Sequence, residues 1–167
     1  MRLLSPTLEM KDAVEVYIRD FEEHGETVAP GAARFKGRSY ETWLADLREL
    51  ETRPAGGYVT GNAYLWFDAD GVLAGMIALR HTLNAELLQS GGHIGYGVRP
   101  SMRRRGHASA MLAAVLPLAR ERGLSRVLIT CDKENIGSAR TIQKNGGELE
   151  NEVLHEGRLI QRYWISL

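Results

Sequence analysis

Three consecutive arginines followed by a glycine form the most chemically suggestive stretch of this sequence. Arg103, Arg104 and Arg105 precede Gly106, and a run of small and apolar residues begins directly after them. Arginine side chains bind phosphate groups through charge-assisted hydrogen bonds. The free N–H groups at the start of a helix, together with the helix dipole, also favour a bound anion. The stretch therefore predicts a phosphate-binding turn, and its alternative is an exposed basic turn without a ligand.

Two elements must hold this turn in place. Residues 91–98 alternate apolar with small or polar residues, as a strand does, and Pro100 ends the strand because it has no N–H for a ladder. Residues 105–122 carry apolar residues on one helical face, and Pro117 inside them predicts a kink. Gly106 gives the backbone room to approach a ligand where a Cβ would intrude. The turn is thus expected between a strand and a helix.

The turn resembles the pyrophosphate-binding motif of the GNAT superfamily of N-acetyltransferases. Arg103-x-x-Gly106-x-Ala108 is similar to the (Q/R)-x-x-G-x-(G/A) signature of that family, and Val98 ends the preceding strand as in the family. Later features follow in the family's order: a strand over 126–131, Asn135, a helix over 138–145 and Gly146-Gly147. The resemblance implies the family's fold, including a V-shaped splay between strands 92–98 and 126–131 that admits the pantetheine arm.

The resemblance also implies a reaction and a cosubstrate. An acetyl group would pass from acetyl-CoA to an amine of a small molecule or a peptide, by direct attack of the amine on the thioester. Backbone N–H groups around Tyr96 and Val98 would polarise the thioester carbonyl as an oxyanion hole. The residues expected to bind acetyl-CoA are Tyr96, Val98, Arg103, Arg104, Arg105, Gly106, His107, Ala108, Asn135 and Ser138.

The sequence departs from the family at the acid that protonates the leaving thiolate. Counting seven residues from Asn135, the position of the usual tyrosine holds Ile142, which cannot donate a proton. A thiol pKa near 8.5 makes the thiolate a tolerable leaving group. The sequence therefore favours departure without an acid, and the hydroxyls of Tyr96 and Ser138 are the alternative donors.

His93 and Tyr96 are the predicted catalytic residues. An imidazole titrates near neutral pH, so His93 is the candidate general base. If strands 72–82 and 91–98 pair about residues 86–88, His93 lies nearly opposite His81. The alternative for either histidine is an ordinary sheet residue. Cys131 is interpreted as a small core residue and not as an acetyl-carrying nucleophile.

The hydrophobic periodicity along the chain predicts an α+β fold in one domain over residues 1–167. Helical faces are expected from Met10 to Phe21 and from Tyr40 to Leu50, and further strands at 2–4, 58–67, 148–155 and 158–166. A strand–helix–strand crossover implies that strands 92–98 and 126–131 are parallel. The expected sheet is mixed, mostly antiparallel and flanked by helices, with loops 26–37, 53–57 and 82–91 shaping the acceptor site.

Composition excludes several function classes. Lys+Arg and Asp+Glu balance at 21 each, so no broad basic surface favours nucleic acid. One cysteine allows no intrachain disulfide, and the scattered histidines predict no metal site. Without an apolar run of about 20 residues or a signal-peptide pattern, a cytoplasmic protein away from membranes is expected. A homodimer is left open. The alternative functions are an acyl-CoA-binding sensor without catalysis and a generic nucleotide-binding domain.

Overall fold

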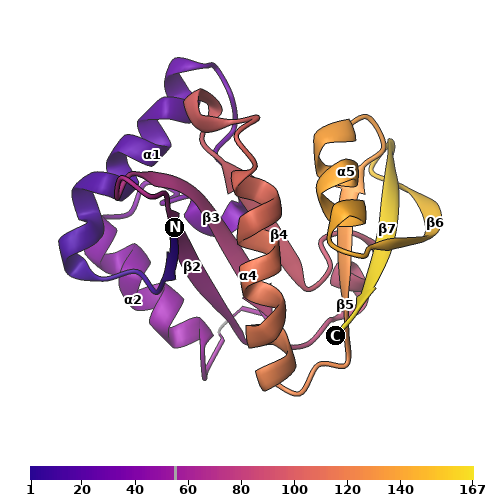
Figure 1. Ribbon diagram of the computed structural model, residues 1–167. Coiled ribbons are helices and arrows are strands. Elements are labelled where there is room, and N and C mark those ends of the chain that lie inside the picture. Colours follow the sequence, from indigo (N-terminus) through magenta and orange to yellow (C-terminus); the bar gives the residue numbers. More distant parts are fainter. Residues whose placement is uncertain (55) are drawn as a thin grey trace.

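A computed structural model describes residues 1–54 and 56–167 of the chain (Figure 1). Its helices and strands are β1 Arg2–Leu4, α1 Lys11–Glu23, α2 Tyr40–Leu50, β2 Gly61–Phe67, β3 Leu73–Arg80, α3 Ala85–Gln89, β4 Ile94–Val98, α4 His107–Glu121, β5 Arg126–Asp132, α5 Ile136–Lys144, β6 Glu148–His155 and β7 Arg158–Ser166. These bounds confirm each predicted helix and strand to within a few residues. The predicted breaker 53–57 follows α2, and Ala55 within it lies outside the described residues.

The strands form two antiparallel sheets flanked by helices, as an α+β fold. The first sheet has the order β1-β2-β3-β4 and the second has the order β5-β7-β6. The parallel ladder predicted between 92–98 and 126–131 is not formed in the part of the chain that the structure describes. One backbone hydrogen bond joins the two sheets here, from the N–H of His93 to the carbonyl of Leu128 at 2.7 Å. In Figure 1 the second sheet and α5 lie beside α4, on the side away from α1 and α2.

The first sheet separates two hydrophobic clusters because strand side chains alternate between its faces. Leu65 and Phe67 pack with the apolar faces of α1 and α2, whereas Trp66 packs with α4. The cluster on the α4 side also includes buried residues of β5, β7 and α5, which places the second sheet against that face. The two faces of β4 are therefore not equivalent, since one faces the loop between α1 and α2 and the other faces α4 and α5.

Local sequence signals explain how the helices of the first layer begin and end. The side chain of Ser39 caps α2 by accepting a hydrogen bond from the N–H of Thr42 at 3.2 Å. Val14, Tyr17 and Phe21 form the buried face of α1, and Gly25 follows that helix with a positive φ of 67°. The loop between α1 and α2 then runs over β4, where it contributes to the site.

Candidate active site

Strands β4 and β5 meet at the beginning of β4. The backbone N–H of Leu128 donates to Nδ1 of His93 at 2.9 Å, and the His93 N–H returns a bond to the Leu128 carbonyl. A Cβ on the preceding Gly92 would lie 2.4 Å from that carbonyl oxygen, and its φ is +61°, so only glycine allows this approach. Beyond this contact β4 and β5 do not pair, and each belongs to a different sheet. The arrangement agrees with the V-shaped splay implied by the family resemblance.

The edge of β4 that faces β5 carries backbone N–H groups that are not used in pairing with β3. Arg99 donates its N–H to Ala74 of β3, and successive residues of a strand point their backbone groups to opposite sides. The N–H groups of Tyr96 and Val98 consequently point away from β3 and toward the opening. These are the groups that the resemblance assigns to the thioester.

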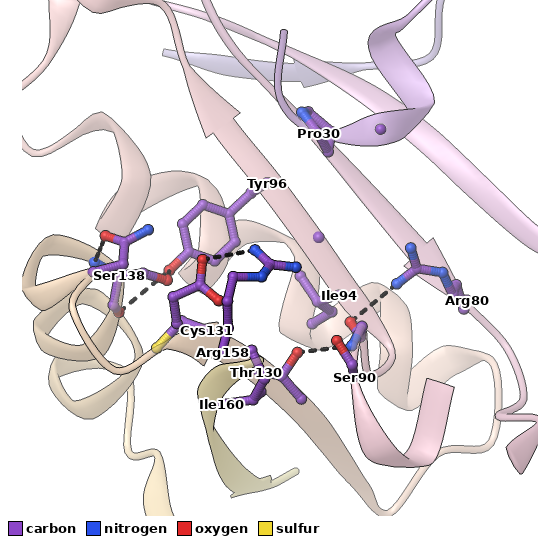
Figure 2. A pocket seen from close by; sticks show the side chains of 15 residues that line it. Pro30, Arg80, Ser90, Ile94, Tyr96, Thr130, Cys131, Ser138, Arg158 and Ile160 are labelled. Atoms are coloured by element: carbon purple, nitrogen blue, oxygen red, sulfur yellow. Dashed lines mark hydrogen bonds and ion pairs between the residues drawn. The ribbon is translucent and has the colours of Figure 1, made fainter. Parts of the chain in front are cut away.

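A cavity of about 300 Å³ lies between the two sheets (Figure 2). The α1–α2 loop, the facing strands and the start of α5 all contribute to its wall. Its lining residues are Pro30, Gly31, Arg80, Ser90, Gly91, Ile94, Gly95, Tyr96, Thr130, Cys131, Asp132, Asn135, Ser138, Arg158 and Ile160. Glycines in β4 make room for the loop, since a Cβ on Gly97 would lie 2.3 Å from the carbonyl oxygen of Ala29.

The hydroxyl of Tyr96 reaches across the opening to α5. It lies 2.8 Å from Oγ of Ser138 and 3.4 Å from the Ser138 carbonyl oxygen. Burial raises the pKa of Tyr96 to about 12, partly opposed by the hydrogen bond with Ser138. The phenol is therefore protonated at neutral pH. The two alternative proton donors named from the sequence thus form one hydrogen-bonded pair (Figure 2).

The surroundings of Ile142 and Cys131 show what each side chain can contribute to the reaction. Ile142 is fully buried in the hydrophobic cluster around α4 and does not line the cavity. A tyrosine at that position would therefore have to enter the core. Cys131 does line the cavity, but burial raises the pKa of its thiol, which disfavours a nucleophilic thiolate.

The geometry gives the general-base prediction for His93 no support. The ring is 7% exposed and bridges the two strands, and His93 is not among the cavity-lining residues. Burial, with a smaller contribution from the charge of Arg80, lowers the pKa of His93 to about 4, so the ring is a weak base. The predicted pairing with His81 is also one residue out of register, because the backbone carbonyl of His93 accepts from the N–H of Arg80. His81 instead contacts Asn62 at 2.7 Å.

The turn that the sequence predicts to bind phosphate lies at the start of α4. Gly106 precedes the helix with a φ of +83°, and nothing lies within 4 Å of where its Cβ would be. The first N–H groups of the helix lack partners within it and face outward from this end. Arg104 and Arg105 are exposed beside it, and Ala108 follows in the first turn. The open space and the N–H groups suit a pyrophosphate.

Two side chains of the motif make contacts within the protein, and their roles in binding acetyl-CoA stay predictions. The guanidinium of Arg103 forms a bidentate ion pair with Glu26, at 2.6 and 2.8 Å, and lies over the ring of Phe21. His107 is 5% exposed and accepts a hydrogen bond from the indole N–H of Trp66 at 3.3 Å. Because the side chain of His107 is buried, this residue can offer a phosphate its backbone N–H but not its ring.

A buried carboxylate anchors the turn to α1. Asp20 accepts from Nε of Arg99 at 2.5 Å and from the backbone N–H and the hydroxyl of Ser101. Burial alone would raise the pKa of Asp20, but the hydrogen bonds from Ser101 and Arg99 outweigh it and lower that pKa. The residues between β4 and α4 are thus fixed by contacts that do not involve the motif itself.

The start of α5 contributes the last of the predicted residues, and β3, β5 and β7 contribute charged residues to the same cavity. Asn135 caps α5 by accepting from the N–H of Ser138 at 3.0 Å, and it also lines the cavity. Arg80, Asp132 and Arg158 line the same cavity, although the sequence did not single out the two arginines. The signal for Arg80 was a lone charge at the end of the otherwise apolar strand Leu73–Arg80.

Comparisons with known proteins agree with this geometry. Residues 2–148 match the family model described as an acetyltransferase (GNAT) domain. Among solved structures, RimJ of Mycobacterium smegmatis in complex with CoA-disulfide is similar, with 18% identity, a TM-score of 0.73 and coverage of 98% of this chain and 80% of that one. The microcin C7 self-immunity acetyltransferase MccE in complex with acetyl-CoA and AMP has 14% identity, a TM-score of 0.71 and coverage of 99% and 91%. None of the curated proteins matches the sequence.

None of the helices in the described residues is long and apolar enough to cross a membrane. No group of three or more histidine, cysteine, aspartate or glutamate residues within 1–54 and 56–167 is arranged to hold a metal ion.

Proposed function

This chain belongs to the GNAT acetyltransferase family, and from that premise we propose that it transfers the acetyl group of acetyl-CoA to an amine of a small molecule or a peptide. Family membership supports acetyl-CoA as the cosubstrate. The observation that carries the proposal is that β4 connects the two parts of the site. Tyr96 of β4 is hydrogen-bonded to Ser138, and the C-terminal end of β4 leads to the turn before α4.

Each part of the donor has a matching group on the protein. The N–H groups at the start of α4 bind the pyrophosphate, with the exposed charges of Arg104 and Arg105 nearby. The pantetheine arm lies along the free edge of β4. The thioester oxygen then receives hydrogen bonds from the N–H groups of Tyr96 and Val98, which stabilise the negative charge that develops during attack.

The acceptor enters through the cavity, from the side that is lined by Pro30, Arg80 and Gly95. The amine nitrogen attacks the carbonyl carbon, an N–C bond forms, and the C–S bond breaks to release the CoA thiolate. The amine attacks as the free base, so an ammonium form first loses a proton to water. The nitrogen then loses a further proton to water as the amide forms, since the pKa of His93 is too low for it to act as the base. The raised thiol pKa of Cys131 favours this direct attack over an acetyl-cysteine intermediate.

Tyr96 assists the leaving group as a hydrogen-bond donor. Complete proton transfer from a phenol with a pKa of about 12 to a thiolate with a pKa of about 8.5 would be uphill by roughly 5 kcal/mol. A hydrogen bond to the charged sulfur, in contrast, contributes about 1.5–3 kcal/mol. Tyr96 therefore stabilises the departing thiolate while keeping its own proton, and Ser138 orients the hydroxyl.

The test is release of the CoA thiol from acetyl-CoA in the presence of an amine panel. We expect amine-dependent release, with the acetylated amine detected by mass spectrometry in equal amount. Acetyl-CoA binding without any turnover across the panel would favour an acyl-CoA sensor. A thermal shift produced by ATP and not displaced by acetyl-CoA would favour a general nucleotide-binding domain.

A further inference from the structure

Arg80 places a positive charge in the wall of the acceptor cavity. It ends β3, and its side chain lies on the face of the first sheet that carries Gly95 and the α1–α2 loop. A Cβ on Gly95 would be 3.9 Å from Nη2 of Arg80 and 3.8 Å from Pro30, so glycine keeps this space open. Figure 2 shows the guanidinium at the edge of the cavity, on the opposite side from Ser138.

No carboxylate in the described part of the chain forms an ion pair with Arg80. One of its nitrogens, Nη1, donates to the carbonyl oxygens of Gly91 and Gly92 at 3.1 and 2.8 Å. These neutral acceptors fix the side chain without neutralising it. Burial lowers the pKa of this guanidinium, and no charged partner contributes to the shift. An arginine nevertheless keeps its charge at any physiological pH.

The other charges of the cavity wall cancel. Nη1 of Arg158 donates to Oδ2 of Asp132 at 3.0 Å, and no further charged residue is among those that line the cavity. Two arginines and one aspartate leave one formal positive charge, which belongs to Arg80. A cationic acceptor such as a polyamine would meet repulsion there. An anionic group would meet an arginine whose Nη2 makes no hydrogen bond with the described residues.

We propose that the acceptor is a small amine carrying a carboxylate, of which free amino acids are the simplest class, and that Arg80 binds this carboxylate beside Gly95. The inference rests on the proposed acetyl transfer and names the substrate class of that site. The carboxylate pairs with Nη2 of Arg80, and the amine lies farther along β4, toward Tyr96 and the thioester.

Matched pairs of amines test this assignment. Each amino acid is compared with the amine that lacks its carboxylate, such as phenylalanine with 2-phenylethylamine and γ-aminobutyrate with propylamine. Rates are normalised to the concentration of free base. We expect kcat/KM to be about tenfold or more higher for the carboxylate-bearing member. The pair β-alanine and 2-aminoethylphosphonate distinguishes a carboxylate site from a general anion site, and a preference for the phosphonate would contradict the carboxylate assignment.

Arg80→Gln separates recognition from catalysis. Glutamine removes the charge and keeps an amide donor on a shorter side chain. We expect KM for the carboxylate-bearing amine to rise about tenfold more than KM for the plain amine, with a smaller effect on kcat. Arg80→Lys should restore part of the affinity. Arg34→Gln is the matched control, because Arg34 also donates to a backbone carbonyl but does not line the cavity.

Equal rates for both members of each pair would overturn the assignment, as would an equal loss for both in Arg80→Gln. If no amine is acetylated, the proposed function fails, and calorimetric titration of the amino acids into the protein saturated with CoA decides the present inference separately. Binding that is lost in Arg80→Gln then supports the carboxylate site, and absence of binding refutes it. Melting temperatures of the variants show whether each remains folded.

Discussion

Acidification should destabilise this protein through His93. The folded protein holds the ring neutral between β4 and β5 with a pKa of about 4, whereas an unfolded chain binds a proton near pH 6.5. The folded pKa is depressed, so this contribution to stability is fully present above pH 6.5 and is lost as the pH falls toward 4. Linkage between the two values gives a loss of about 2 kcal/mol between pH 7 and pH 5.

His93→Gln provides the comparison. Glutamine can still accept from the Leu128 N–H but does not titrate, so it removes the pH-dependent part and retains an acceptor for that bond. The free energy of unfolding is measured by urea denaturation at pH 7 and pH 5 for both proteins. Wild type should lose about 2 kcal/mol more than the variant over this interval. Equal losses would refute the description of His93 as a buried neutral bridge, because all other titrating groups are shared.

Three further substitutions test the packing around the site. Asp20→Asn should lower the free energy of unfolding by about 3 kcal/mol, because it leaves the charge of Arg99 buried without its partner; a loss below 1 kcal/mol in chemical denaturation would contradict this. Gly97→Ala should cost about 1–3 kcal/mol in the same assay, since its Cβ would collide with the Ala29 carbonyl, and a neutral effect would show that the loop can move. Ile142→Tyr should destabilise by a similar amount and give no gain in kcat, because that side chain points into the core; a faster enzyme would indicate that the tyrosine hydroxyl reaches the leaving group.

Much of the fold was predictable because it depends on local periodicity. The hairpin of β6 and β7, for example, follows directly from two apolar-polar strands around Glu156-Gly157, and its bounds are those predicted. The division into two sheets was not predictable in this way. It depends on the approach of Gly92 to Leu128 and on the loss of pairing beyond it, and these are contacts between distant segments.

The site shows the same division between local and distant causes. The turn before α4 was predictable from Gly106 and its basic neighbours, since a helix start has free N–H groups whatever surrounds it. The directions of the side chains in this turn were not predictable from the sequence. Arg103 turns toward Glu26, which is 77 residues away in the sequence, and His107 turns inward to meet Trp66. The position of Arg80 in the cavity wall could not be predicted either, because it depends on how β3, β4 and the α1–α2 loop come together.

The dependence of kcat/KM on pH for wild type and Tyr96→Phe tests the proposed reaction most directly. With an accepted amine, we predict an ascending limb from deprotonation of the amine and no descending limb near pH 9–10, since the pKa of Tyr96 is about 12. Tyr96→Phe should lower the plateau about 10- to 100-fold without changing the shape of the profile. Full activity in Tyr96→Phe would show that the thiolate leaves unassisted, and a descending limb near pH 9–10 that the variant lacks would show that Tyr96 gives up its proton.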